Sequence, residues 1–214
     1  MRSLVLSLVL ASLAATHGWA QANCLEQLKF PAQGRWAEYK ATFKEEPHTI
    51  RYGVIGQESR GGKKLQWVEM RMEGANKDRN MIYQMLVPGS LTQIGQVQEI
   101  VFKTGDRPAM KMGGQMVEMI RSQLDQQSIY GEMCKGVSLV GKEKVTVPAG
   151  AFEALHYNSA EHGSDSWISS SVPFSLVKST GKDYQVELVA QGDGATSSIK
   201  EKPQEMKGMG GPPR

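Results

Sequence analysis

The chain has 214 residues, with 25 lysines and arginines against 22 aspartates and glutamates, a formal net charge of +3 and 40% hydrophobic residues. So small a charge does not predict nucleic-acid binding, for which a concentrated basic surface is typical. The hydrophobic and charged fractions are those of an ordinary globular chain, so disorder throughout is excluded. Two cysteines are too few for a disulfide-dense scaffold.

The first 22 residues have the pattern of an export signal. Arg2 gives a basic start, an apolar stretch follows over 4–15, and Ala20-Gln21-Ala22 is a small-x-small cleavage site. The apolar stretch is shorter than the roughly 20 residues of a membrane-spanning helix, so we expect no transmembrane segment. We therefore expect residues 1–22 to be a cleaved signal peptide and the mature protein to be periplasmic.

Export changes the meaning of the two cysteines, Cys24 and Cys134. In an oxidising compartment, a single pair most simply forms one disulfide. A reactive thiol would need a CxxC partner or a nearby activating base, and neither is visible around these positions. We predict a structural Cys24–Cys134 bridge.

Residues 23–43 predict a short helix followed by a strand. Asn23-Cys24-Leu25-Glu26 resembles a capping box, and the helix that it begins would stop before Pro31. From residue 37 to 43, apolar and polar residues alternate as in a half-buried strand. We expect Glu46-Pro47 to break that strand.

The next strands are connected by short segments marked with glycine or proline, which favours an antiparallel meander because no crossover helix fits between them. The expected strands before the helix are 49–57, 65–72, 80–87 and 96–103. The expected strands after it are 137–147, 152–159, 164–169, 175–180 and 183–191. We expect residues 23–200 to form one domain and 201–214, which lack apolar periodicity, to be a disordered tail.

A helix is expected to interrupt the meander from Gly114 and to end before Gly131. Its spacing places four apolar residues on one face. They are Met116, Met119, Ile120 and Leu124.

The stretch 145–199 contains the most distinctive motifs. They are VTVPAGAFEA from residue 145, DSWIS from 165, VPFSLVK from 172, ELV from 187 and GDGA from 192. The stretch resembles exported bacterial proteins of unknown function that share a V-x-V-P-A-G-x-F turn, a tryptophan strand and a VPFGLVK strand. More distantly, it resembles the half-barrel superfamily of the periplasmic lipoprotein carrier and its outer-membrane receptor (LolA/LolB-like). The motifs cover about a quarter of the chain.

The resemblance implies an incomplete antiparallel barrel that curves around a hydrophobic groove, with an apolar ligand. It carries over no catalytic residues, because the motifs are turn and strand signatures. Combined with the strand order, it predicts a mainly β (α+β) fold. A single curved antiparallel sheet forms an incomplete barrel, and an N-terminal helix and the Met-rich helix cover its concave face. The chain departs from the motif at Ser175, where a glycine would permit close backbone approach or a bulge.

Methionine is the unusual residue, because nine of the twelve lie between Met70 and Met133. Flexible, polarisable thioethers suit a cavity that adapts to acyl chains, although the same spacing also fits ordinary core residues. We predict a groove for a lipid, an acyl chain or a lipoprotein-like ligand. The expected lining is Met70, Met72, Met81, Tyr83, Met85, Met116, Met119, Ile120 and Leu124. The helix would be a lid that moves when the ligand enters, tied by the disulfide to the N-terminal helix.

Two alternatives to this groove stay open. Met-x-Met pairs at 70/72 and 110/112 supply the soft ligands that select Cu(I), although no histidine lies within these clusters. The protein could instead be a module for an envelope protein partner, with no small ligand.

No motif predicts an enzyme, a cofactor or a metal. His156, Glu161 and His162 flank a hairpin, but their spacing matches no strict zinc signature. The serines at 164 and 166 lie near His162 without a G-x-S-x-G elbow. The glycines at 192 and 194 precede no helix, so they do not predict a phosphate-binding loop.

Overall fold

The structure is a computed structural model that describes residues 24–90, 96–126, 134 and 136–206. The expected signal peptide, residues 1–22, therefore lies outside the described residues.

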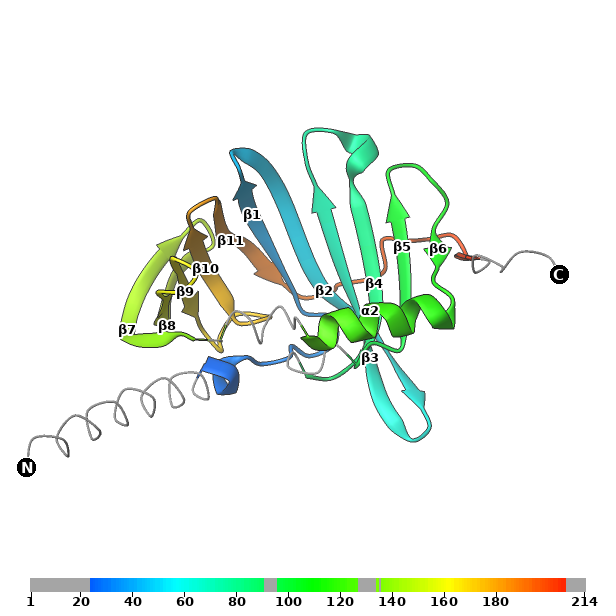
Figure 1. The fold of residues 1–214 in the computed structure, drawn as a ribbon, viewed down its shortest axis with the longest axis horizontal. Helices are drawn as coiled ribbons and strands as arrows, with labels where there is room; N and C mark the ends of the chain where they lie inside the picture. Colours follow the sequence, from blue (N-terminus) through cyan, green and yellow to red (C-terminus); the bar gives the residue numbers. More distant parts are fainter. Residues whose placement is uncertain (1–23, 91–95, 127–133, 135, 207–214) are drawn as a thin grey trace, which may run out of the picture.

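The described strands form one open, curved sheet (Figure 1). They are β1 (Trp36–Phe43), β2 (Glu46–Arg60), β3 (Lys63–Glu73), β4 (Met81–Pro88), β5 (Glu99–Thr104), β6 (Met110–Lys111), β7 (Ser138–Val147), β8 (Gly150–Ser159), β9 (Ser164–Ile168), β10 (Leu176–Gly181), β11 (Tyr184–Gly192) and β12 (Gln204–Glu205). The order across the sheet is β12-β6-β5-β4-β3-β2-β1-β11-β10-β9-β8-β7. The two outer strands do not pair with each other, so the predicted mainly β fold with a single curved, open sheet is confirmed. The sheet is antiparallel except for the β12–β6 pair.

Three helical segments accompany the described part of the sheet. Residues 24–27 form a helical turn, and a 3₁₀ turn, η1 (Lys77–Arg79), connects β3 to β4. The predicted Met-rich helix is α2 (Gly114–Gln126), which lies across β2 to β5 in Figure 1.

The predicted break at Glu46-Pro47 is wrong. The chain turns one step earlier, at Lys44 and Glu45, which take positive φ values of 47° and 71°. Positive φ at both central residues is the geometry of a tight two-residue hairpin turn. Pro47 is then the second residue of β2, opposite Thr42, a position near the strand start where a missing N–H is tolerated.

The folded part of the chain extends past residue 200. Gln204 and Glu205 form β12, parallel to β6, and Lys103 pairs with Glu201 at 2.6 Å. Of the expected tail, 201–206 are thus part of the fold, whereas 207–214 lie outside the described residues.

The two faces of the sheet carry different cores, because successive strand residues point to opposite sides. On the face that α2 covers, here called the inner face, Val54, Val68 and Ile100 pack in the same cluster as Val117 of the helix. On the opposite, outer face, Val101 packs with Ile199 in a second, smaller cluster.

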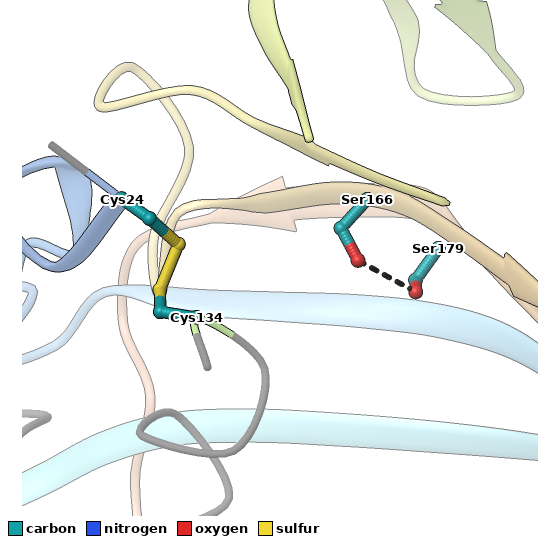
Figure 2. The surroundings of a disulfide bond; sticks show 4 residues. All are labelled: Cys24, Cys134, Ser166 and Ser179. Atoms are coloured by element: carbon teal, nitrogen blue, oxygen red, sulfur yellow. Dashed lines mark hydrogen bonds between the residues drawn. A yellow bond between two sulfur atoms is a disulfide. The ribbon is translucent and has the colours of Figure 1, made fainter. Parts of the chain in front are cut away.

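The predicted Cys24–Cys134 disulfide is present, with 5.7 Å between the Cα atoms (Figure 2). Both cysteines are fully buried in the inner core. The bridge ties the N-terminal helical turn to the segment just before β7. The expected tie to the end of α2 involves residues 127–133, which lie outside the described residues.

Ser175, the departure from the motif, takes a left-handed backbone conformation with φ 64°. Glycine adopts this conformation more readily, because it has no Cβ. The serine side chain contributes something that glycine lacks: its buried hydroxyl accepts a hydrogen bond from the Lys29 N–H at 2.8 Å. Ser175 therefore holds the segment after the N-terminal turn against the sheet.

We predict that Ser175→Ala lowers the free energy of unfolding by about 1–3 kcal/mol, because it leaves the Lys29 N–H without its acceptor. Ser175→Gly loses the same acceptor but relieves left-handed strain of roughly 1–2 kcal/mol, so its loss should be smaller. Urea unfolding of the oxidised protein measures both. Equal stability of Ser175→Ala and wild type would contradict the assigned hydrogen bond.

Candidate functional site

Five of the side chains predicted to line a groove lie together on the inner face, and we call them the methionine patch. They are Met70, Met72, Met81, Tyr83 and Met85. Across β3 and β4, Met70 is opposite Tyr83 and Met72 is opposite Met81. Side chains directly opposite in an antiparallel pair share a face and touch, so these residues form one continuous surface.

Aromatic rings extend the patch onto both neighbouring strands. Tyr52 of β2 is opposite Met70, and Phe102 of β5 is opposite Tyr83, with 6.4 Å between the stacked ring centroids. The Tyr83 hydroxyl donates to the Met81 sulfur at 3.6 Å. Burial raises the pKa of Tyr52, which keeps its phenol neutral. The whole surface is therefore uncharged.

Every member of the methionine patch, together with Tyr52 and Phe102, is only half-buried. The neighbouring side chains of the inner face, such as Val54, Val68 and Val87, are fully buried. Apolar side chains at the centre of a sheet face are usually the most buried of all. The patch thus retains accessible apolar surface on the side of the sheet that carries α2.

The helix presents a different face from the one expected. Val117 is its buried residue, at 4% exposure, with Met116 and Ile120 half-buried beside it. Met119 is 54% exposed, and the Leu124 side chain lies outside the described residues. The sequence reasoning missed Val117, whose signal was its i, i+3 spacing to Ile120.

The described contacts of α2 with the rest of the chain are few. Met112, just before the helix, donates its N–H to the Ile100 carbonyl at 2.9 Å. Near the far end, the Arg121 guanidinium donates to the Val97 carbonyl and pairs with Glu118 one turn earlier. Within its described side chains, the helix is thus held by these polar contacts and by the packing of Val117 and Ile120 against the inner core.

His156 sits between two carboxylates and an indole ring. Its Nε2 lies 2.7 Å from Asp165 Oδ1, and its Nδ1 lies 3.3 Å from Glu143 Oε1. The imidazole stacks on Trp167, with ring centroids 4.5 Å apart, and the indole N–H donates to Glu143. The hydrogen bonds from Asn158 and His156 hold the pKa of Asp165 below its usual value.

The other polar residues of this hairpin do not join His156. His162 and Glu161 are exposed in the turn, and within the described ranges no three His, Cys, Asp or Glu side chains form a group that could hold a metal. The Ser166 hydroxyl is buried and contacts the Ser179 hydroxyl at 2.9 Å (Figure 2). The Ser166–Ser179 contact therefore links β9 to β10.

No protein-family model matches the chain, and no curated protein matches it. The chain is similar to the solved structure of a candidate lipoprotein from Parabacteroides distasonis, at 9% identity and a TM-score of 0.39. The match covers 77% of this chain and 98% of that protein. Another is a candidate exported protein with a YmcC-like fold from Bacteroides fragilis, at 9% identity and a TM-score of 0.36, covering 78% and 99%. Among the helices described, none has the length and apolar character to span a bilayer.

We predict that Asp165 makes the stability of the protein depend on pH. A carboxylate with a lowered pKa stabilises the fold above its unfolded pKa of about 4, and this contribution is lost as the pH falls through the folded value. Asp165→Asn should therefore lower the free energy of unfolding at pH 7 by about 0.5–1 kcal/mol, a small effect because the carboxylate is partly exposed.

Urea unfolding from pH 7 to pH 3 measures this difference, which should shrink toward zero in acid. Asp183→Asn, at an exposed turn carboxylate, is the matched control and should leave stability nearly unchanged. A difference for Asp165→Asn that stays constant down to pH 3 would contradict the assignment.

Proposed function

We propose that the protein is a non-enzymatic binding protein for an apolar ligand, an acyl chain, held between the methionine patch and α2. The observation that carries this proposal is the half-buried state of the patch at the centre of the inner face. For an uncharged surface of thioethers and aromatic rings, contact with hydrocarbon has a lower free energy than contact with water. Each buried CH₂ group contributes about 0.8 kcal/mol.

Thioethers favour a ligand with many conformations. Methionine has three rotatable side-chain bonds and a polarisable sulfur, so Met70, Met72 and Met85 can adjust to chains of different length. The flanking rings of Tyr52 and Phe102 provide rigid walls by contrast. Such a lining suits a class of lipids better than one rigid molecule.

We assign α2 the role of a lid over this surface. Its described attachments lie at Met112 and Arg121, and Val117 packs into the inner core between them. A shift of the helix would expose the patch while the strand ladders stay paired. Such lid motions commonly admit a ligand.

The sequence resemblance supports the same role in the periplasm. The export pattern of residues 1–22 would deliver a single domain to that compartment, and the implied half-barrel superfamily carries apolar cargo. The disulfide agrees with an oxidising location, because such bridges persist there.

We predict that a fluorescent fatty-acid probe binds the wild-type protein, and that Met70→Glu weakens binding at least about tenfold. The new carboxylate would face Tyr52 and Tyr83, where an acyl chain could not solvate it. Met119→Glu is the matched control: it places the same charge on the exposed side of α2 and should keep the affinity within about twofold.

Circular dichroism and urea unfolding establish that each variant folds, and Met70→Ala provides a milder change should Met70→Glu be unstable. Absence of probe binding to wild type, or equal loss in Met70→Glu and Met119→Glu, would refute the groove.

Native mass spectrometry of the protein isolated from periplasm separates the alternatives. Bound lipid supports the proposal, whereas bound copper or a protein partner without lipid overturns it.

A further inference from the structure

A hollow lies on the outer face, on the opposite side of the sheet from the methionine patch. It has a volume of about 400 Å³ and is bounded by β2, β3 and the segment 194–200. Arg51 and Arg71 lie in its lining, next in sequence to Tyr52 and Met70, which point to the inner face. The volume is within the range of small-molecule sites.

Two arginines on neighbouring strands line this hollow. Arg51 of β2 and Arg71 of β3 are directly opposite in the ladder. Like charges directly opposite each other destabilise a sheet, so an anion bound beside Arg71 would stabilise this pair. Lys200 adds a third cation to the same lining.

The acidic residues nearby do not neutralise Arg71. Glu38 pairs with Arg51 at 3.4 Å and lies outside the hollow. Glu69, the one carboxylate in the lining, is 5% exposed and accepts hydrogen bonds from the Ser198 N–H, the Ser198 hydroxyl and the Gln84 amide. Within the described part of the chain, the Arg71 guanidinium makes no ion pair or hydrogen bond.

The surroundings hold these groups in position. The Arg51 guanidinium lies over the Trp36 ring, 3.7 Å from its centroid, and this contact fixes its plane. Glu69 pins Ser198 to the sheet, so the wall that carries Thr196 and Lys200 is fixed as well. Lys200 Nζ donates to the Ser197 carbonyl at 2.5 Å, which places its charge at the rim of the hollow.

We propose that this outer-face hollow is a binding site for the phosphate group of a small phosphate ester. Guanidinium groups donate paired, charge-assisted hydrogen bonds to phosphate oxygens, and Arg71 has all of its donors available for them. The lining carries three cations against one carboxylate that is already hydrogen-bonded. The volume exceeds that of phosphate alone and leaves room for a glycerol-sized alcohol. The site is independent of the apolar groove, because the sheet separates the two.

The test is isothermal titration of glycerol 3-phosphate into the full mature protein at low ionic strength, with glycerol as the uncharged comparison. We expect saturable binding of the phosphate ester and none of glycerol. Arg71→Gln should weaken binding at least about tenfold, whereas Arg107→Gln, at an exposed arginine in the β5–β6 turn, should keep it within about twofold.

Vesicles distinguish the two sources of such a phosphate. If sedimentation with phosphatidylglycerol vesicles depends on Arg71 and the soluble ester does not bind, the site is assigned to a lipid headgroup. If only the soluble ester binds, the site is assigned to a soluble metabolite.

Thermal unfolding adds a second readout. Arg71→Gln should be at least as stable as wild type without phosphate, since it removes a like-charge pair, and should lose the stabilisation that the ester gives wild type.

Absence of binding in both arms, or equal binding by Arg71→Gln and Arg107→Gln, would overturn the proposal. So would a marked loss of stability in ligand-free Arg71→Gln, because it would show that Arg71 already has a structural partner.

Discussion

The pairing of β1 with β11 is the constraint on which the rest of the structure depends. It joins a meander from the first half of the chain to one from the second half, from Trp36 opposite Gly192 to Phe43 opposite Tyr184. Small side chains at Ala37 and Ala41 occupy the inner face of β1 at this junction. Without this ladder, β1 to β6 and β7 to β11 would be separate sheets, and neither the shared inner core nor the outer-face hollow would be complete.

The sheet separates two chemistries that alternate along the same strands. On β3, Met70 and Met72 belong to the inner face, whereas Glu69 and Arg71 belong to the outer face. Such alternation is a direct consequence of strand geometry, in which successive side chains point in opposite directions. The two faces of this single sheet therefore carry an apolar surface on one side and a charged surface on the other.

Much of the fold could be predicted locally, because period-two alternation, glycine and proline turns and the helical spacing after Gly114 are properties of short segments. The methionine patch also followed from alternation within β3 and β4. The face of α2 could not be settled in this way, since Met116, Val117, Met119 and Ile120 are all apolar and only packing selects Val117. The two-residue strands β6 and β12 have no periodicity long enough to detect.

By itself, the sequence determined the order and type of the longer elements, the pairing of the only two cysteines and the uncharged character of the patch. The tertiary structure alone decided which distant segments meet. The ladder between β2 and β3 places Arg51 opposite Arg71, and the return of residues 194–200 across the outer face brings Lys200 and Ser198 to them. Those residues are up to 149 positions apart (51 to 200), and no local pattern encodes such a meeting, because it depends on the register and curvature of the whole sheet.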